Sequence, residues 1–405
     1  MTGGMRASFV VSLALSLVAV GCGGTSDSPG NGGGGGSSNA GGGGSSSAGG
    51  GGSSNAGGGG SSNAGGGGNA GGGGIASGGG GGSAGGGGNG GGGGTPVTPS
   101  GFWSPTYFMP LDDSPQSLPD VIAATGEKSF LLAFVLDSGN CTPAWDGLAA
   151  NPVSSDTTVA AVIAAARAAG GDVGISFGGY NGTELGQSCG SASALAAAYQ
   201  AVIDKYKLTH IDLDVENAAL GDTANETKRF QAVKMLEDAA TAAGRTLNVS
   251  LTIPMTTVGF PDTGRAQISL AIAAGARIDI FNIMDFDYGG PAATMTDADI
   301  AVAEDVHAQL KALYPAWTDA QAYAHTGLQL MNGHTDQPSE LFTTDTFKGL
   351  LAYAQSKHLG WLANWALNRD RACDPSVPHN WADGACSSVD QQPYDFTKIL
   401  AQYGG

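Results

Sequence analysis

From about residue 100 onward, this sequence alternates between short apolar runs and longer alanine-rich segments. This pattern limits the fold classes that the chain can adopt. Such alternation is typical of parallel strands joined by helices. Eight apolar runs occur, at residues 106–109, 129–136, 172–177, 209–216, 247–253, 278–284, 325–330 and 360–365. Eight strand–helix repeats predict an α/β fold, a closed (β/α)8 TIM barrel. A doubly wound open sheet is the competing fold, but no Gly-rich phosphate loop follows the first run.

Helical patterns fill the gaps between the runs. The clearest cover residues 156–169, 193–206, 224–243 and 297–313. Asp156 is expected to cap the first of them, because a carboxylate accepts hydrogen bonds from the unpaired N–H groups of a first helical turn. A region of roughly 300 residues also has the size of one such barrel.

Residues 23–99 consist largely of repeated Gly, Ser, Asn and Ala. A segment of this composition cannot bury a core, so a disordered Gly/Ser-rich linker is predicted. A flexible coil of about seventy residues has a root-mean-square span of about 45 Å. The predicted organisation is a signal segment over 1–22, the linker over 23–99 and the barrel over 100–405.

The first 22 residues have the layout of an export signal. Arg6 precedes an apolar stretch, residues 9–20, that is too short to cross a bilayer as a helix. Cys22 resembles the lipidated cysteine of bacterial lipoproteins, although Ala19 stands where leucine is usual. Ordinary signal cleavage is the alternative. Both predict export, either to a lipid anchor on Cys22 at the bacterial surface (outer membrane) or as a secreted protein.

Four further cysteines are expected to form disulfides in an exported protein. Cys373 and Cys386 are separated by a short loop and are predicted to pair, which leaves Cys141 for Cys189.

The formal net charge of −18 comes almost entirely from the folded region. No nucleic-acid partner is expected, because binding to phosphates needs the opposite sign of charge. An acidic surface is compatible with a substrate that is an uncharged polymer. The alternative is that the acidic surface is only solvated and binds no partner. No cofactor or metal is predicted, and the chain is expected to be a monomer.

Residues 209–216 place three carboxylates at alternate positions of an apolar strand. Because strand side chains alternate between faces, Asp212, Asp214 and Glu216 are expected to point into the barrel, and His210 away from it. Buried acids about 7 Å apart should not all ionise at neutral pH. One or two should keep a proton, as a general acid must. A solvated edge strand and a divalent-metal site are the alternatives.

This run resembles the Asp-x-x-Asp-x-Asp-x-Glu signature of glycoside hydrolase family 18, with Thr209 in place of the first aspartate. That departure is expected to alter proton sharing behind the site. The resemblance implies that Glu216 protonates the glycosidic oxygen, that Asp214 orients the substrate's own N-acetyl group as nucleophile, and that Asp212 tunes Asp214. Such substrate-assisted catalysis is an exception to the two-carboxylate rule. It implies a 2-acetamido substrate such as chitin or N-acetylglucosamine oligosaccharides.

Two other strand ends extend the resemblance. Gly178 and Gly179 match a Ser-x-Gly-Gly segment whose small residues let the backbone crowd the site, with a simple turn as the alternative. Trp365 matches the tryptophan that forms the floor of the family's catalytic subsite, where indole stacks on a sugar ring. A buried core position is the alternative for Trp365, and more so for Trp361, which shares its face.

The sixth run ends in a segment similar to the family's Met-x-Tyr-Asp stretch. Met284 and Asp287 match it, but Phe286 replaces the tyrosine whose hydroxyl helps to hold the acetamido oxygen. Tyr288 is expected to supply a hydroxyl from nearby. A loop hydrogen bond is the alternative role for Asp287 and Tyr288.

The remaining candidates lie at the rim. Trp145 is a candidate outer-subsite platform, and Tyr107 and Met331 are candidate lining residues, with core packing as the alternative for these two. Arg369 and Asp370 are expected to form a structural pair.

The sequence thus predicts a chitinase-like hydrolase that cleaves β-1,4 linkages between N-acetylglucosamine units with retention, with endo action expected. An endo-β-N-acetylglucosaminidase or a peptidoglycan-directed relative would use the same acids. A non-hydrolytic chitin-binding protein is the alternative from another functional class, and Thr209 and Phe286 are the departures that favour it.

Overall fold

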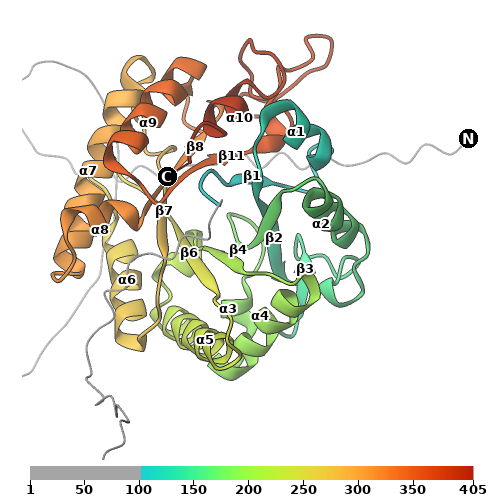
Figure 1. Cartoon of the computed structure of the whole chain (residues 1–405), viewed down its shortest axis with the longest axis vertical. Helices are drawn as coiled ribbons and strands as arrows, with labels where there is room; N and C mark the ends of the chain where they lie inside the picture. Colours follow the sequence, from blue (N-terminus) through green and yellow to red (C-terminus); the bar gives the residue numbers. More distant parts are fainter. Residues whose placement is uncertain (1–101, 405) are drawn as a thin grey trace, which may run out of the picture. The chain divides into compact units, whose positions relative to one another are not determined.

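The computed structural model describes residues 102–404 as a closed barrel of parallel strands surrounded by helices (Figure 1). The predicted signal segment, linker and Cys22 lie outside these residues. The barrel strands are β1 (Thr106–Phe108), β2 (Ser129–Asp137), β4 (Asp172–Gly178), β5 (His210–Asp214), β6 (Asn248–Pro254), β7 (Ile280–Met284), β8 (Thr326–Met331) and β11 (Trp361–Trp365). Strand β1 pairs with both β2 and β11, which closes the sheet. All eight predicted strands and the predicted barrel are confirmed.

Helices cover the outside of the barrel (Figure 1). They are α1 (Leu118–Thr125), α2 (Thr158–Ala168), α3 (Leu185–Ser188), α4 (Ala192–Tyr206), α5 (Thr223–Ala242), α6 (Asp262–Ala274), α7 (Met295–Leu313), α8 (Asp319–Ala324), α9 (Thr344–Lys357) and α10 (Asp395–Leu400). The four helices predicted most clearly are confirmed within about two residues at each end. None of the helices within residues 102–404 has both the length and the apolar character of a membrane span.

Loops at the carboxyl ends of the strands carry the smaller elements. These are β3 (Pro143–Trp145), β9 (Gly333–His334), β10 (Leu341–Phe342) and four short 3-10 turns, η1 (Val153–Ser155), η2 (Asn217–Gly221), η3 (Ala292–Thr294) and η4 (Leu367–Arg369). Strand β3 pairs antiparallel with β2, and β9 pairs with β10.

Asp156 lies one residue before Thr157, which is the N-cap residue of α2, but its carboxylate caps the helix as predicted. Oδ1 of Asp156 accepts from the N–H groups of Thr158 and Val159, both at 3.0 Å, and Oδ2 accepts from Ala160 at 2.9 Å. One carboxylate therefore satisfies three N–H groups at the start of α2, where the helix dipole also favours negative charge.

Both disulfides are confirmed, Cys141–Cys189 and Cys373–Cys386. Each ties together loops on the side of the barrel where the strands end.

Two separate cores hold the barrel together. Alternate strand residues, such as Ile211 and Leu213 of β5, point outward and pack under the helices. A smaller cluster fills the inside of the barrel, with Phe102, Tyr107, Leu131, Ala133, Ile280, Trp361, Ala363 and Ala366. The interior is thus a packed core, and its upper end carries the acidic residues.

Candidate active site

The three predicted acids line up along β5 from the barrel interior to its mouth. Asp212 is completely buried, Asp214 is 2% exposed, and Glu216, directly after the strand, is partly exposed. Strand alternation is the cause, because Ile211, Leu213 and Val215 take the outward face and pack under the helices. The predicted inward orientation of the acids is confirmed.

Asp212 sits in a ring of hydroxyl donors. Its Oδ2 accepts from the hydroxyls of Ser176 at 2.6 Å and Tyr107 at 2.9 Å. Its Oδ1 accepts from Ser250 at 2.5 Å and Thr252 at 2.8 Å. Burial raises the pKa of Asp212, and the four hydroxyl bonds oppose that rise. Asp212 is therefore the member of the trio best equipped to hold negative charge.

The donors come from neighbouring strands in register with β5. Ser176 of β4 and Ser250 of β6 both pair with Asp212, so their side chains project to the same face of the sheet. Ser176 is the serine of the predicted Ser-x-Gly-Gly segment, but this role was not predicted for it, nor for Ser250 and Thr252. The signal was present, because residues 248–253 alternate polar and apolar as the acidic strand does.

Asp214 lies above Asp212 and has little to stabilise its charge. Its Oδ1 is buried without a hydrogen-bond partner among the described residues. Burial, followed by the charges of Glu216, Asp212 and Glu184, raises the pKa of Asp214 well above its usual range. An open acceptor atom is thus held beside Glu216.

Glu216 is partly exposed and keeps its proton to a higher pH than an ordinary glutamate. Burial, and then the charges of Asp287, Glu184 and Asp336, raises its pKa to about 7. A carboxyl group with this pKa is still largely protonated in mildly acidic solution, as a general acid must be.

Glu184 was not found from the sequence. It forms a buried ion pair with Arg229 of α5, and a Cβ added to Gly178 would lie 3.5 Å from its carboxyl carbon. The pair is buried beside the acidic strand, and the charge of Glu184 contributes to the raised pKa values of Asp214 and Glu216. No motif marks Glu184, because its distance from the acids depends on how α3 and α5 pack.

Two expectations about β5 are wrong. His210 shares the inward face with the acids, stacks on Phe102 and packs at a tilt against Trp361 at the lower end of the barrel. The physical reason is simple parity, since 210, 212 and 214 are alternate positions. Thr209 is exposed just before the strand, so it cannot take part in proton sharing behind the site, where hydroxyl donors surround Asp212.

The two predicted glycines are required by a close approach of two strands. A Cβ on Gly178 would lie 1.9 Å from the carbonyl oxygen of Asp214, and one on Gly179 would lie 2.7 Å from the ring of Phe134. Both residues also have positive φ, at 111° and 89°. Their backbone presses against the acidic strand, and substrate contact by either glycine stays a prediction.

Trp365 is partly exposed at the end of β11, and its ring stacks on Phe134 with centroids 5.5 Å apart. It also meets the ring of Tyr107 edge-on at 5.8 Å. The indole therefore contacts the ring of the tyrosine that donates a hydrogen bond to Asp212. Trp361 is buried in the barrel interior.

Four other predicted lining residues behave differently. Trp145 is not an exposed platform, because it is fully buried under the helices and donates its indole N–H to Tyr206 at 2.8 Å. Tyr107 is buried and reaches the acid Asp212 rather than the open mouth. Met284 and Met331 end β7 and β8 with buried side chains, and contact with substrate stays a prediction for both.

The loop after β7 is held by Glu340. Its carboxylate accepts from the backbone N–H groups of Asp287 at 2.7 Å, Gly289 at 2.8 Å and Gly290 at 3.0 Å. Asp287 accepts from the backbone of Gln337, and burial raises its pKa to about 7. Asp287 therefore makes the loop hydrogen bond and also acts on Glu216 through its charge.

Two predicted side-chain roles are corrected. The Tyr288 hydroxyl donates to Asp299 of α7, so it does not replace the hydroxyl missing at Phe286. Arg369 and Asp370 do not pair with each other. Arg369 donates to backbone carbonyl groups, and Asp370 accepts from Thr397 and Gln391. Adjacent residues at a chain turn face different elements, which a sequence motif does not reveal.

A grouping of potential metal ligands within residues 102–404 consists of Cys373, His379 and Cys386. The two sulfur atoms are joined in the disulfide, so they are not thiolate ligands.

Comparison with known proteins finds chitinases among those similar to this chain. No protein-family model matches the chain. A probable bifunctional chitinase/lysozyme of Escherichia coli is 29% identical over 288 residues, which cover 67% of this chain and 32% of that protein. Endochitinase 11 of Metarhizium anisopliae is 27% identical over 286 residues, covering 67% of this chain and 54% of that protein. The chain therefore spans only about a third to a half of these relatives.

The catalytic domain of a hyperthermophilic chitinase from Pyrococcus furiosus superposes with a TM-score of 0.66 and 27% identity, over 75% of this chain and 95% of that domain. The predicted resemblance to family 18 chitinases is confirmed. The region that matches is the barrel, and the chitinase-like site on it is the one built on β5.

Proposed function

We propose that the barrel is a chitinase that hydrolyses β-1,4 linkages between N-acetylglucosamine units with retention at the anomeric carbon. One observation carries the proposal. Three acids along β5 and directly after it occupy graded environments, from a hydroxyl-bound Asp212, through an Asp214 whose Oδ1 has no partner among residues 102–404, to a partly exposed Glu216. The chitinases with similar barrels support the choice of polymer.

Glu216 acts as the general acid. It transfers its proton to the glycosidic oxygen while the bond from that oxygen to the anomeric carbon breaks. Because its pKa is raised to about 7, the proton is present at the acidic pH values where the enzyme should work best. The resulting carboxylate then takes a proton from the water that attacks the anomeric carbon.

The substrate's acetamido group supplies the nucleophile. Its carbonyl oxygen bonds to the anomeric carbon as the leaving group departs, and the intermediate is an oxazolinium ion. The open Oδ1 of Asp214 accepts the acetamido N–H and holds the group in line. Negative charge shared by Asp212 and Asp214 stabilises the positive intermediate.

Trp365 provides the floor for the sugar unit that is cleaved. It is partly exposed, fixed from one side by Phe134, and lies over Tyr107. An indole held in this way offers an apolar face to the C–H groups of a pyranose ring while polar groups remain at its edge.

Glu216→Gln tests the proposal, because the amide is nearly isosteric and cannot donate a proton as an acid. We expect release of products from a β-1,4 N-acetylglucosamine hexamer to fall by about 10²–10⁴-fold, with hexamer binding retained. Glu304→Gln on α7 is the control, since it makes the same change at a partly exposed acid that bonds Tyr323 and Lys357 on the outer helices. Unchanged turnover in Glu216→Gln would end the proposal.

A non-hydrolytic chitin-binding role is the second candidate, and one observation favours it. Phe286 lacks the hydroxyl that family members use near the acetamido group, and the Tyr288 hydroxyl is engaged by Asp299. Tight hexamer binding by the unmodified chain without any hydrolysis would support this role.

The domain organisation is also proposed. We infer a signal over residues 1–22, a linker over 23–99 and a monomeric barrel over 100–405, exported and either anchored by a lipid on Cys22 or released. Metabolic labelling with a fatty acid in a bacterial host, with Cys22→Ala as control, distinguishes these fates.

A further inference from the structure

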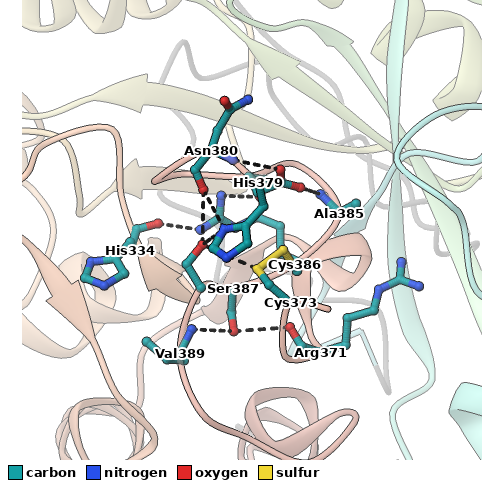
Figure 2. Close-up of a disulfide and its surroundings, with 12 residues drawn as sticks. His334, Arg371, Cys373, His379, Asn380, Ala385, Cys386, Ser387 and Val389 are labelled. Atoms are coloured by element: carbon teal, nitrogen blue, oxygen red, sulfur yellow. Dashed lines mark hydrogen bonds between the residues drawn. A yellow bond between two sulfur atoms is a disulfide. The ribbon is translucent and has the colours of Figure 1, made fainter. Parts of the chain in front are cut away.

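A disulfide-closed loop stands beside the catalytic mouth. It follows β11 and η4 and runs from Cys373 to Cys386 before the chain enters α10 (Figure 1). Ser387, next to the disulfide, donates its N–H to the carbonyl of Arg371 at 3.0 Å and accepts from the N–H of His334 at 3.1 Å (Figure 2). The loop is therefore fixed at its base to β9, which follows β8 at the mouth.

The approach of β9 to this base is very close. A Cβ on Gly333 would lie 1.9 Å from the carbonyl oxygen of Ser387, so only glycine fits there. Inside the loop, the N–H groups of Asn380 and Ala385 donate to the carboxylate of Asp383 (Figure 2). These bonds and the disulfide fix the loop as a defined platform.

Trp381 lies in this loop with its indole half exposed, at 50%. Its ring centroid is 3.6 Å from that of His334. The other tryptophans of the chain are buried or partly buried, at positions 103, 145, 317, 361 and 365. Trp381 therefore contributes little to the core, while its position is held from behind by an imidazole.

The loop is joined to the catalytic acids through Arg369. The Arg369 guanidinium donates to the carbonyl groups of His334 and, at 2.9 Å, of Asp383. The charges of Asp336 and Asp287 act on this guanidinium, and the same two acids act on Glu216. Trp381 and the proton donor thus flank one cluster of polar residues at the barrel mouth.

We propose that Trp381 is a stacking platform for an N-acetylglucosamine unit of a bound chain, outside the subsite whose floor is Trp365. An exposed indole on a fixed loop, with His334 and Asn380 beside it to meet sugar hydroxyls, has the chemistry of a carbohydrate subsite. Trp381 takes the outer role that was expected of Trp145, which is buried. This inference rests on the proposed function and makes the enzyme selective for longer oligomers.

The test compares binding of two β-1,4 N-acetylglucosamine oligomers, a hexamer and a dimer, in the full chain carrying Glu216→Gln. Trp381→Ala should weaken hexamer binding about two- to tenfold, the loss expected for one aromatic stacking contact. Dimer binding should stay unchanged, because a dimer fills the inner subsites alone. Trp381→Phe should restore part of the hexamer affinity.

Val377→Ala is the matched control, since Val377 is equally exposed in the same loop. It should leave both affinities unchanged, and the thermal unfolding midpoints of the loop variants should agree. Equal losses on hexamer and dimer, or no loss on the hexamer, would overturn the platform. Failure of the proposed function has a different signature, because the chain without substitutions would then release no product from the hexamer whatever residue stands at 381.

Discussion

The two ends of the barrel interior differ sharply although the same strand lines both. At the lower end, the imidazole of His210 packs between Phe102 and Trp361, and neither of its ring nitrogens has a hydrogen-bond partner among residues 102–404. At the upper end, Asp212 accepts four hydroxyl hydrogen bonds. Strand alternation therefore determines which residues point inward. The side chains of the neighbouring strands determine whether an inward residue packs in the core or takes part in the active site.

Burial has opposite consequences for charge at the two ends. It lowers the pKa of His210 to about 3, so this side chain is neutral in the folded protein. It raises the pKa values of the acids, so the upper end retains protons that can be donated.

The largest effect is expected at the buried ion pair beside the acids. Glu184→Ala leaves Arg229 buried and without its anionic partner, which should lower the free energy of unfolding by about 3–5 kcal/mol. Denaturant titration measures the loss. Asp238→Ala, which removes the exposed partner of Lys234, should cost less than about 0.5 kcal/mol. Similar losses in the two variants would contradict the view that buried charge depends on its partner.

The second prediction compares substitutions of buried acids at the two ends of the barrel. Asp212→Asn should lower kcat by about 10²-fold, because the amide disturbs the hydroxyl ring that positions the acids above it. Asp279→Asn is the matched change at the lower end, where Asp279 accepts from Val249 and Arg277. It should reduce stability and leave kcat unchanged. Equal kcat losses would show that the two ends are not functionally distinct.

The third prediction concerns stability and pH at the lower end. The folded pKa of His210, about 3, lies below the unfolded value near 6.5, so the unfolded state binds more protons between these values. Stability should therefore be complete above about pH 6.5 and fall by up to about 1.4 kcal/mol per pH unit below it. His210→Leu should remove this dependence and keep kcat. If the free energy of unfolding changed with pH in the same way for the unsubstituted chain and for His210→Leu, the prediction would be wrong.

The smallest effect is expected in the pH profile of hydrolysis. Glu216 must be protonated, so kcat/KM should fall as pH rises through about 7. Asp287→Asn removes a negative charge that raises the pKa of Glu216, and the falling limb should move to lower pH by no more than about one unit. Asp297→Asn removes an exposed acid on α7 and should leave the limb in place. A shift toward higher pH would have the wrong sign.

Much of the fold followed from the sequence because its signals are local. Apolar runs separated by alanine-rich segments predicted eight strands and a barrel, and alternation predicted the inward acids. The site was predicted less completely. Its acids and Trp365 were marked by motifs, but the hydroxyl donors Ser250 and Thr252 depend on the register between β5 and β6.

The errors share one physical cause, which is that a motif gives a residue type without its neighbours. Trp145 matched a loop of related enzymes, but its indole packs under the helices against Tyr206. Tyr288 was close in sequence to the missing hydroxyl, but its own hydroxyl turns to Asp299. In both cases a contact between distant segments decided the outcome.

The barrel and the inward acidic face could be predicted from the sequence, because periodicity acts along a single strand or helix. The short spacing predicted the Cys373–Cys386 disulfide, and Cys141–Cys189 followed by elimination. Two features of the site became visible only in the folded chain. Asp212 accepts hydrogen bonds from hydroxyl groups on three other strands, and the Glu184–Arg229 ion pair is buried beside the acids. The reason is that charge and proton affinity depend on every group within a few ångströms, and those groups come from segments far apart in the chain.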